Sequence, residues 1–95
     1  MGKAYLVGHI TVKDCAKWDE YRSRVPATMA PFGAELVFRG SLAQVFSGSH
    51  ARSDVVVACF PDRAALEAWH GSPAYQALIP LRNEAAEVDL MSYDA

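Results

Sequence analysis

Few side chains in this sequence could carry chemistry, and they are spread along the whole chain. Histidines stand at His9, His50 and His70, and Arg39 follows an apolar segment. A histidine changes its protonation near neutral pH and can act as acid, base or ligand contact. An arginine presents a planar fork of donors that matches a carboxylate. His9 and Arg39 are therefore the first candidates for contacts to a small molecule.

Both residues also have a structural interpretation. His9 lies within an extended segment and, by alternation, shares a side with Tyr5, so it could be a hydrogen-bonded residue in an interface. Alternation places Arg39 with Glu35, and Arg39 could pair with Glu35 or with Asp89. We expect His9 and Arg39 on the same apolar sheet face, where an unpaired polar group costs desolvation unless it is used.

Two aromatic residues form a second candidate set. Trp69 and Tyr75 lie on either side of a helix break at Gly71-Ser72-Pro73. They could form an aromatic wall over a small-molecule pocket. Aromatic residues at helical spacing are more often part of a core, and the Tyr75 hydroxyl would then need a partner. Arg82 could bind a ligand anion or pair with a neighbouring carboxylate, while His50 and His70 are expected on the surface. The carboxylates within reach of Arg82 in the sequence are Glu84, Glu87 and Asp89.

No motif identifies a reaction. The serines lack the setting of a nucleophile elbow, and the six glycines form no phosphate-binding loop. The three histidines and two cysteines have no metal-ligand spacing. We therefore leave the catalytic residues unassigned, with His9 as the best candidate, and expect neither a metal nor a tightly bound cofactor.

Composition narrows the class of protein. The 95 residues suit one domain over residues 1–95, and 52% of them are hydrophobic, which is high for so short a chain. The net charge is −2 and the nine basic residues are scattered, so nucleic acid is excluded as the main partner. No apolar run approaches the ~20 residues that span a bilayer, so a membrane is excluded too. We expect a cytoplasmic location.

The order of predicted elements is strand, helix, strand, strand, helix, strand. Asp14, Asp62 and Ser72 are typical helix N-caps. Pro26 predicts a break or kink in the first helix near Val25. The predicted strands cover residues 4–12, 35–39, 53–60 and 88–93. Right-handed crossovers of this order give an α+β, ferredoxin-like βαββαβ domain: a four-stranded antiparallel sheet with two helices, each possibly broken, on one face.

The helices cover only one face of this sheet. The segment from Val55 to Phe60 is apolar on both sides, and Tyr5, Val7 and Met91 need cover on the open face. An exposed apolar face of that size is an interaction surface. We expect a homodimer through the open sheet face, with a cavity between the two sheets.

Several short motifs together resemble a known family. Arg39-Gly40, Phe60-Pro61, Trp69, the run Ser72-Pro73-Ala74-Tyr75-Gln76, and Arg82 are similar to the bacterial family catalogued as domain of unknown function 1330, over residues 5–91. The resemblance implies a dimeric α+β barrel, in a superfamily that includes cofactor-free monooxygenases, muconolactone isomerase and haem-dependent relatives. The chain departs from the family pattern at His70-Gly71 and at Ser47-Gly48, so no role is carried over to those positions.

Three hypotheses follow from these observations. The first is an enzyme that converts a small apolar or aromatic metabolite in the barrel cavity, with His9, Arg39 and Tyr75 as its polar groups. The second is a non-catalytic ligand-binding or sensing module that uses the same cavity. The third is a purely structural dimerisation domain whose interface is packed solid.

Overall fold

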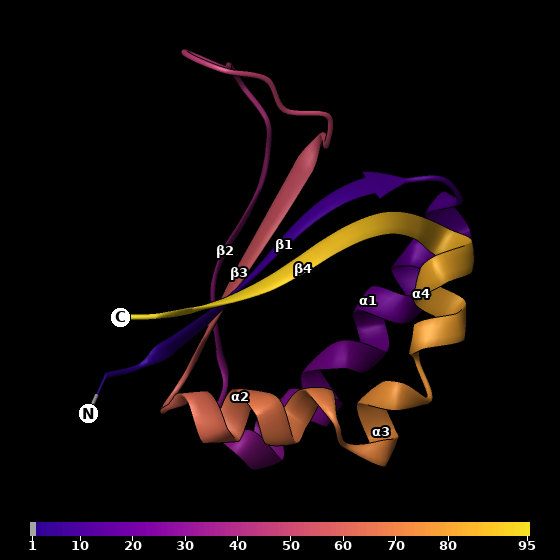
Figure 1. The fold of residues 1–95 in the computed structure, drawn as a ribbon. Coiled ribbons are helices and arrows are strands. Elements are labelled where there is room, and N and C mark those ends of the chain that lie inside the picture. Colours follow the sequence, from indigo (N-terminus) through magenta and orange to yellow (C-terminus); the bar gives the residue numbers. More distant parts are fainter. Residues whose placement is uncertain (1) are drawn as a thin grey trace.

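The computed structural model describes residues 2–95, which form one antiparallel sheet and a layer of helices (Figure 1). The sheet order is β2-β3-β1-β4, so each neighbouring pair of strands runs antiparallel. This is the predicted ferredoxin-like α+β fold. In chain order the elements are β1 (Ala4–Val12), α1 (Cys15–Met29), the 3₁₀ helix η1 (Ala30–Phe32), β2 (Glu35–Ser41), β3 (Asp54–Phe60), α2 (Arg63–His70), α3 (Pro73–Gln76), α4 (Ile79–Ala85) and β4 (Ala86–Asp94).

Helix α1 continues through Pro26 as one α-helix, so a break near Val25 with a second helical piece from Pro26 is wrong. The Asp14 carboxylate caps the helix as predicted, accepting from the Lys17 backbone N–H at 3.0 Å. Tyr21 and Val25 pack against the core, and this packing outweighs the backbone hydrogen bond that proline cannot make. The chain leaves η1 at Gly33, whose φ of 72° favours glycine.

The second helical region is divided as the sequence indicates. The Asp62 carboxylate accepts from the Ala65 N–H, and the Ser72 hydroxyl accepts from the Tyr75 N–H, so both predicted caps are confirmed. Pro73 stands at the start of α3, and a further break precedes Pro80 in α4. These breaks turn the chain so that α2 lies under the sheet and α4 lies beside α1 (Figure 1).

Strand β2 contains one extra residue opposite β3. Leu36 pairs with Ala58 and Phe38 pairs with Val57, so the register shifts between them at Val37. A bulge of this kind reverses the alternation of every side chain beyond it. Phe38 therefore shares a face with Val57, and the face of each later residue in β2 is opposite to the one that simple alternation predicts.

The two sheet faces differ in cover. Leu6, Ile10, Ala58 and Phe60 are buried under the helices, where Trp69 and Tyr75 complete the core. The other face is open, and several large apolar side chains on it are exposed, including Phe38 at 49% and Tyr93 at 53%.

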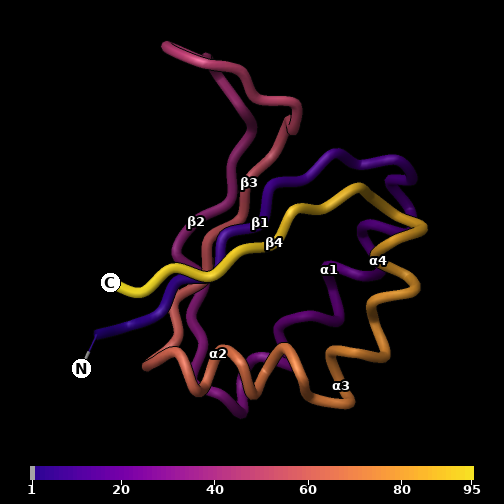
Figure 2. Tube along the Cα trace, in the orientation of Figure 1, coloured from indigo at the N-terminus to yellow at the C-terminus, as the bar shows by residue number. Residues whose placement is uncertain are grey.

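The twelve-residue segment 42–53 joins β2 to β3 and projects beyond the sheet (Figures 1 and 2). Its apolar side chains are exposed, and Phe46 among them is 91% exposed. Across residues 2–95, no helix has the length and apolar character that crossing a bilayer requires.

Candidate functional site

One cavity of about 190 Å³ lies between the helix-covered face of the sheet and helices α1, α2 and α3. Its wall is largely apolar, with four aromatic side chains and two arginines as the distinctive groups. It lies inside a single chain, whereas the cavity predicted from the sequence lies between two paired sheets. The distinctive lining residues are Trp18, Tyr21, Arg22, Arg39, Trp69 and Tyr75.

Small residues in the sheet keep the floor of the cavity open. Gly8 of β1 and Ala58 of β3 both line it. A Cβ atom at Gly8 would stand 3.1 Å from a methyl of Val56 and 3.3 Å from one of Leu90, closer than ordinary contact. A larger residue at position 8 would therefore crowd the floor and reduce the space for a ligand.

Aromatic rings form the wall opposite this floor. Trp18 stacks on Tyr21 with ring centroids 5.2 Å apart, and Trp69 lies 4.2 Å from Tyr75. The indole N–H of Trp69 donates to the Thr28 hydroxyl at 3.0 Å, which fixes the ring. Trp69 and Tyr75 are only 1% and 0% exposed. Both residues therefore belong to the core and also line the cavity, and their contact with a ligand stays a prediction.

The polar end of the wall is a pair of phenols. The hydroxyls of Tyr21 and Tyr75 lie 2.9 Å apart, and Nη1 of Arg82 donates to the Tyr75 oxygen at 3.0 Å. Burial, and then the neighbouring Tyr75, raise the pKa of Tyr21 well above the usual tyrosine value. The Tyr21 hydroxyl therefore keeps its proton at neutral pH. Either oxygen can donate in this contact, and the hydroxyl proton that is not used in it is free for another acceptor.

Arg39 lies on the helix-covered face of the sheet, so the prediction that it shares the open face with His9 is wrong. The bulge at Val37 is the reason, because it places Arg39 opposite Val56 in the register. Both Arg39 and Arg22 line the cavity. Partial burial, and then the positive charge of Arg22, lower the pKa of Arg39 from its ordinary value. An arginine stays charged at neutral pH even so.

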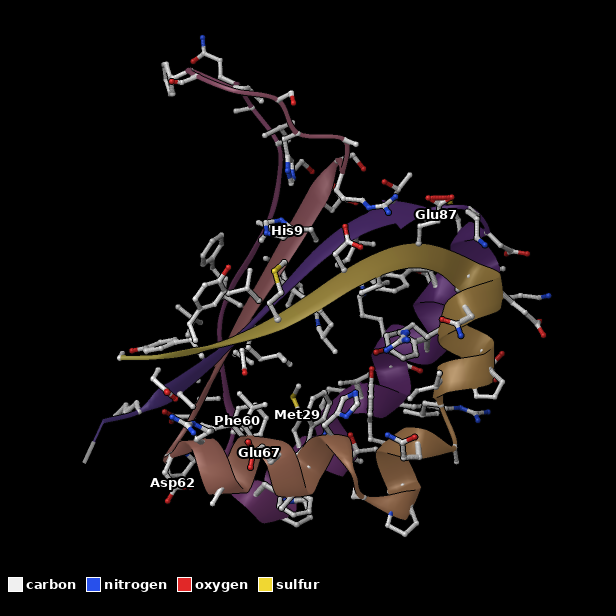
Figure 3. All side chains as sticks on the ribbon, viewed as in Figure 1. His9, Met29, Phe60, Asp62, Glu67 and Glu87 are labelled. Carbon is white, nitrogen blue, oxygen red and sulfur yellow. The ribbon has the colours of Figure 1, made fainter. Side chains whose placement is uncertain are left out.

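His9 is on the open face, as predicted, and does not line this cavity. Figure 3 shows His9 on the side of β1 away from the helices, whereas Met29 lies between the sheet and the helices. The His9 ring contacts His50 edge-on, with centroids 4.8 Å apart. Its buried Nδ1 atom has no hydrogen-bond partner within residues 2–95, and neither has the Thr11 hydroxyl on the same face.

The remaining candidates occupy other places. His70 is exposed, and together with Arg82 it lines an open hollow between α2 and strands β1 and β4. Arg82 bonds to Tyr75 and to the Asn83 side chain, and none of the predicted carboxylate partners pairs with it in the described part of the chain. No cluster of three or more His, Cys, Asp or Glu side chains suited to a metal ion forms among residues 2–95.

The structure therefore brings together Arg39, Trp69 and Tyr75, and it separates His9 from them. Sequence reasoning missed Tyr21, Arg22 and the site role of Trp18. Trp18 and Tyr21 were recognisable only as the apolar face of α1, and Arg22 follows Tyr21 directly. The signal that could have identified Tyr21 is its hydroxyl, which needs a partner once the helix face is buried.

A family model described as a domain of unknown function (DUF1330) matches residues 3–94. No curated protein matches the sequence.

Three solved structures illustrate the fold match. The RPA0582 protein of unknown function from Rhodopseudomonas palustris aligns with a TM-score of 0.83 at 15% identity, over 99% of this chain and 82% of that one. SnoaB from Streptomyces nogalater, described as a cofactor-independent oxygenase, aligns with a TM-score of 0.73 at 17% identity, over 100% and 94%. A dimeric ferredoxin-like protein of unknown function from Jannaschia sp. CCS1 aligns with a TM-score of 0.70 at 15% identity, over 99% and 100%.

Proposed function

The chain belongs to the DUF1330 family, and from this premise we propose that it binds or converts a small apolar or aromatic metabolite in the cavity beneath its sheet, without a tightly bound cofactor. The observation that carries this proposal is the cavity of about 190 Å³ with a hydrogen-bonded phenol pair in its wall. An apolar pocket with a few convergent polar groups is the usual form of a small-molecule site.

The size and wall of the cavity indicate the kind of molecule. A volume of about 190 Å³ suits one ring or two fused rings. The rings of Trp18 and Trp69 can pack against an aromatic ligand in offset or edge-on geometry. The free hydroxyl proton of the Tyr21–Tyr75 pair would then form a hydrogen bond with a carbonyl or hydroxyl oxygen of that ligand.

The same phenol pair limits the chemistry we propose. Because the pKa of Tyr21 is raised, its hydroxyl is a hydrogen-bond donor at neutral pH and not a base. Such a donor can polarise a ligand carbonyl, as a catalytic site requires, or simply anchor a ligand. The likeness to SnoaB supports the catalytic version as fold-level analogy only. The second version is a ligand-binding or sensing module.

We also propose that a second copy of the chain covers the open sheet face. The face carries Val7 and Val57 on its two central strands and the exposed Phe38 on the edge strand β2, together with the unpartnered Nδ1 atom of His9. An apolar surface of this kind is typical of an interface. The Jannaschia protein of the same fold is described as dimeric, which supports this arrangement.

The binding proposal is tested by nuclear magnetic resonance with a set of one-ring and two-ring aromatic metabolites. The chain has two tryptophans, Trp18 and Trp69, and both line the cavity, so their indole N–H signals report on it directly. We expect at least one compound to shift both signals in a saturable way. If no compound in the set shifts either signal, the cavity is not the binding site we propose.

A matched pair of variants locates the binding. Ala34 lines the cavity, whereas Ala27 is exposed on α1 and does not. Ala34→Phe should fill the cavity and abolish the shifts, and Ala27→Phe should leave them unchanged. Recovering the bound compound unaltered after long incubation would favour the binding module over the enzyme.

A further inference from the structure

The two arginines in the cavity wall specify the charge of the ligand. The cavity is lined by Arg22 and Arg39, and no Asp or Glu lines it among the residues that the structure describes. The remaining wall is apolar or aromatic apart from the hydroxyl groups of Tyr21 and Tyr75. The cavity therefore combines two cationic side chains and a pair of phenols in an otherwise apolar wall.

The arginines have few partners of their own. Arg39 makes no salt bridge within residues 2–95, and Arg22 has only a long contact of 4.0 Å to Asp19 on the solvent side of α1. Asp54 lines an adjoining surface hollow with both arginines, but it forms no ion pair with either of them there. Both arginines line the cavity, and the positive charge of Arg22 lowers the pKa of Arg39. An anion between the two guanidinium groups would stabilise both of them.

We propose that the ligand is an aromatic or apolar carboxylate, held by its carboxylate between Arg22 and Arg39 with its ring inside the cavity. This inference rests on the proposed function and adds the chemical class of the ligand. The two guanidinium forks match the oxygens of a carboxylate, and the aromatic walls take the ring. A polar substituent on the ring could form a hydrogen bond with the Tyr21–Tyr75 pair.

The test compares two probes that differ only in charge. The carboxylate 2-naphthoate and its neutral isostere 2-naphthamide are titrated into the protein by calorimetry. We expect 2-naphthoate to bind at least about tenfold more tightly, because hydrogen bonds to charged groups contribute more than neutral ones. The double variant R22Q/R39Q should lose this preference while it keeps its affinity for the amide.

Another arginine of α1, Arg24, provides the control. Arg24 is exposed, pairs with Glu20 at 2.7 Å and does not line the cavity. R24Q changes the net charge by the same amount as either single substitution, and it should keep the full preference for the carboxylate. R22Q and R39Q are exposed substitutions, and circular dichroism checks that each variant is folded.

The possible outcomes separate this inference from the proposed function. Equal binding of the two probes to the unmodified protein would overturn the carboxylate inference and leave the binding cavity intact. A preference that survives in R22Q/R39Q would overturn the assignment to these arginines. If neither probe binds, the proposed function fails for aromatic ligands and this inference fails with it.

Discussion

The hydroxyl of Tyr21 should make the stability of the fold depend on alkaline pH. Its pKa is raised in the folded chain, and that of an unfolded tyrosine is about 10. The folded state therefore binds this proton more tightly, so the stabilisation is complete below pH ~10 and is lost as the pH rises above it.

Tyr21→Phe measures this contribution. The variant should lose about 1 kcal/mol of unfolding free energy at pH 8, since one buried hydrogen bond is gone. Between pH 8 and pH 11 its stability should fall less than that of the unmodified protein, as measured by urea unfolding. Tyr93→Phe, at an exposed position, should follow the unmodified protein. Parallel pH curves for Tyr21→Phe and the unmodified chain would contradict the account.

At the level of single residues, the sequence predicted positions that depend on simple alternation. His9 lies on the face predicted for it, with Tyr5 and Val7. Arg39 does not, because one extra residue at Val37 reverses the alternation, and no composition signal marks that bulge. The ligand-contact roles of His9, Arg39, Trp69 and Tyr75 stay predictions, and the location of His9 separates it from the other three.

Helix α1 shows how tertiary packing overrides a local signal. Asp14, Asp62 and Ser72 cap their helices as predicted, because a cap depends on only a few consecutive residues. The break predicted at Pro26 is absent, because the residues on both sides of the proline pack on the core. Local rules therefore predicted the caps of the helices better than the effect of a proline inside one.

Pro26→Ala should stabilise the chain. Alanine restores the N–H that can donate to the Arg22 carbonyl, and proline within a helix costs up to about 3 kcal/mol. We expect a gain of about 1–3 kcal/mol by urea unfolding, reduced by lost contacts where Pro26 lines the cavity. Pro73→Ala is the matched control, because Pro73 is at the start of α3, where no N–H is needed. An equal gain from both substitutions would contradict this explanation.

At the scale of the whole molecule, we propose that the two faces of the sheet have different roles. The helix-covered face encloses the cavity, and the open face is proposed to pair with a second copy. The sequence predicted the uncovered apolar face because Val55 to Phe60 is apolar on both sides. It could not predict the cavity beneath the helices, because that space depends on how side chains distant in the sequence pack.

Two substitutions test the proposed dimer interface, one inside the interface and one outside it as the control. Val57 lies at the centre of the open face, between Val7 and Phe38, so Val57→Asp places a charge in the proposed interface. Ala68→Asp places the same charge on the exposed side of α2. The first should give single chains and the second should not, provided that circular dichroism shows both to be folded.

Native mass spectrometry of the unmodified protein, purified from the organism that makes it, tests the proposed dimer and the proposed ligand in one spectrum. The account predicts the mass of two chains together with a small aromatic or apolar molecule that is released on denaturation. A single chain at micromolar concentration, with no bound molecule, would contradict the paired sheet face and the binding cavity together.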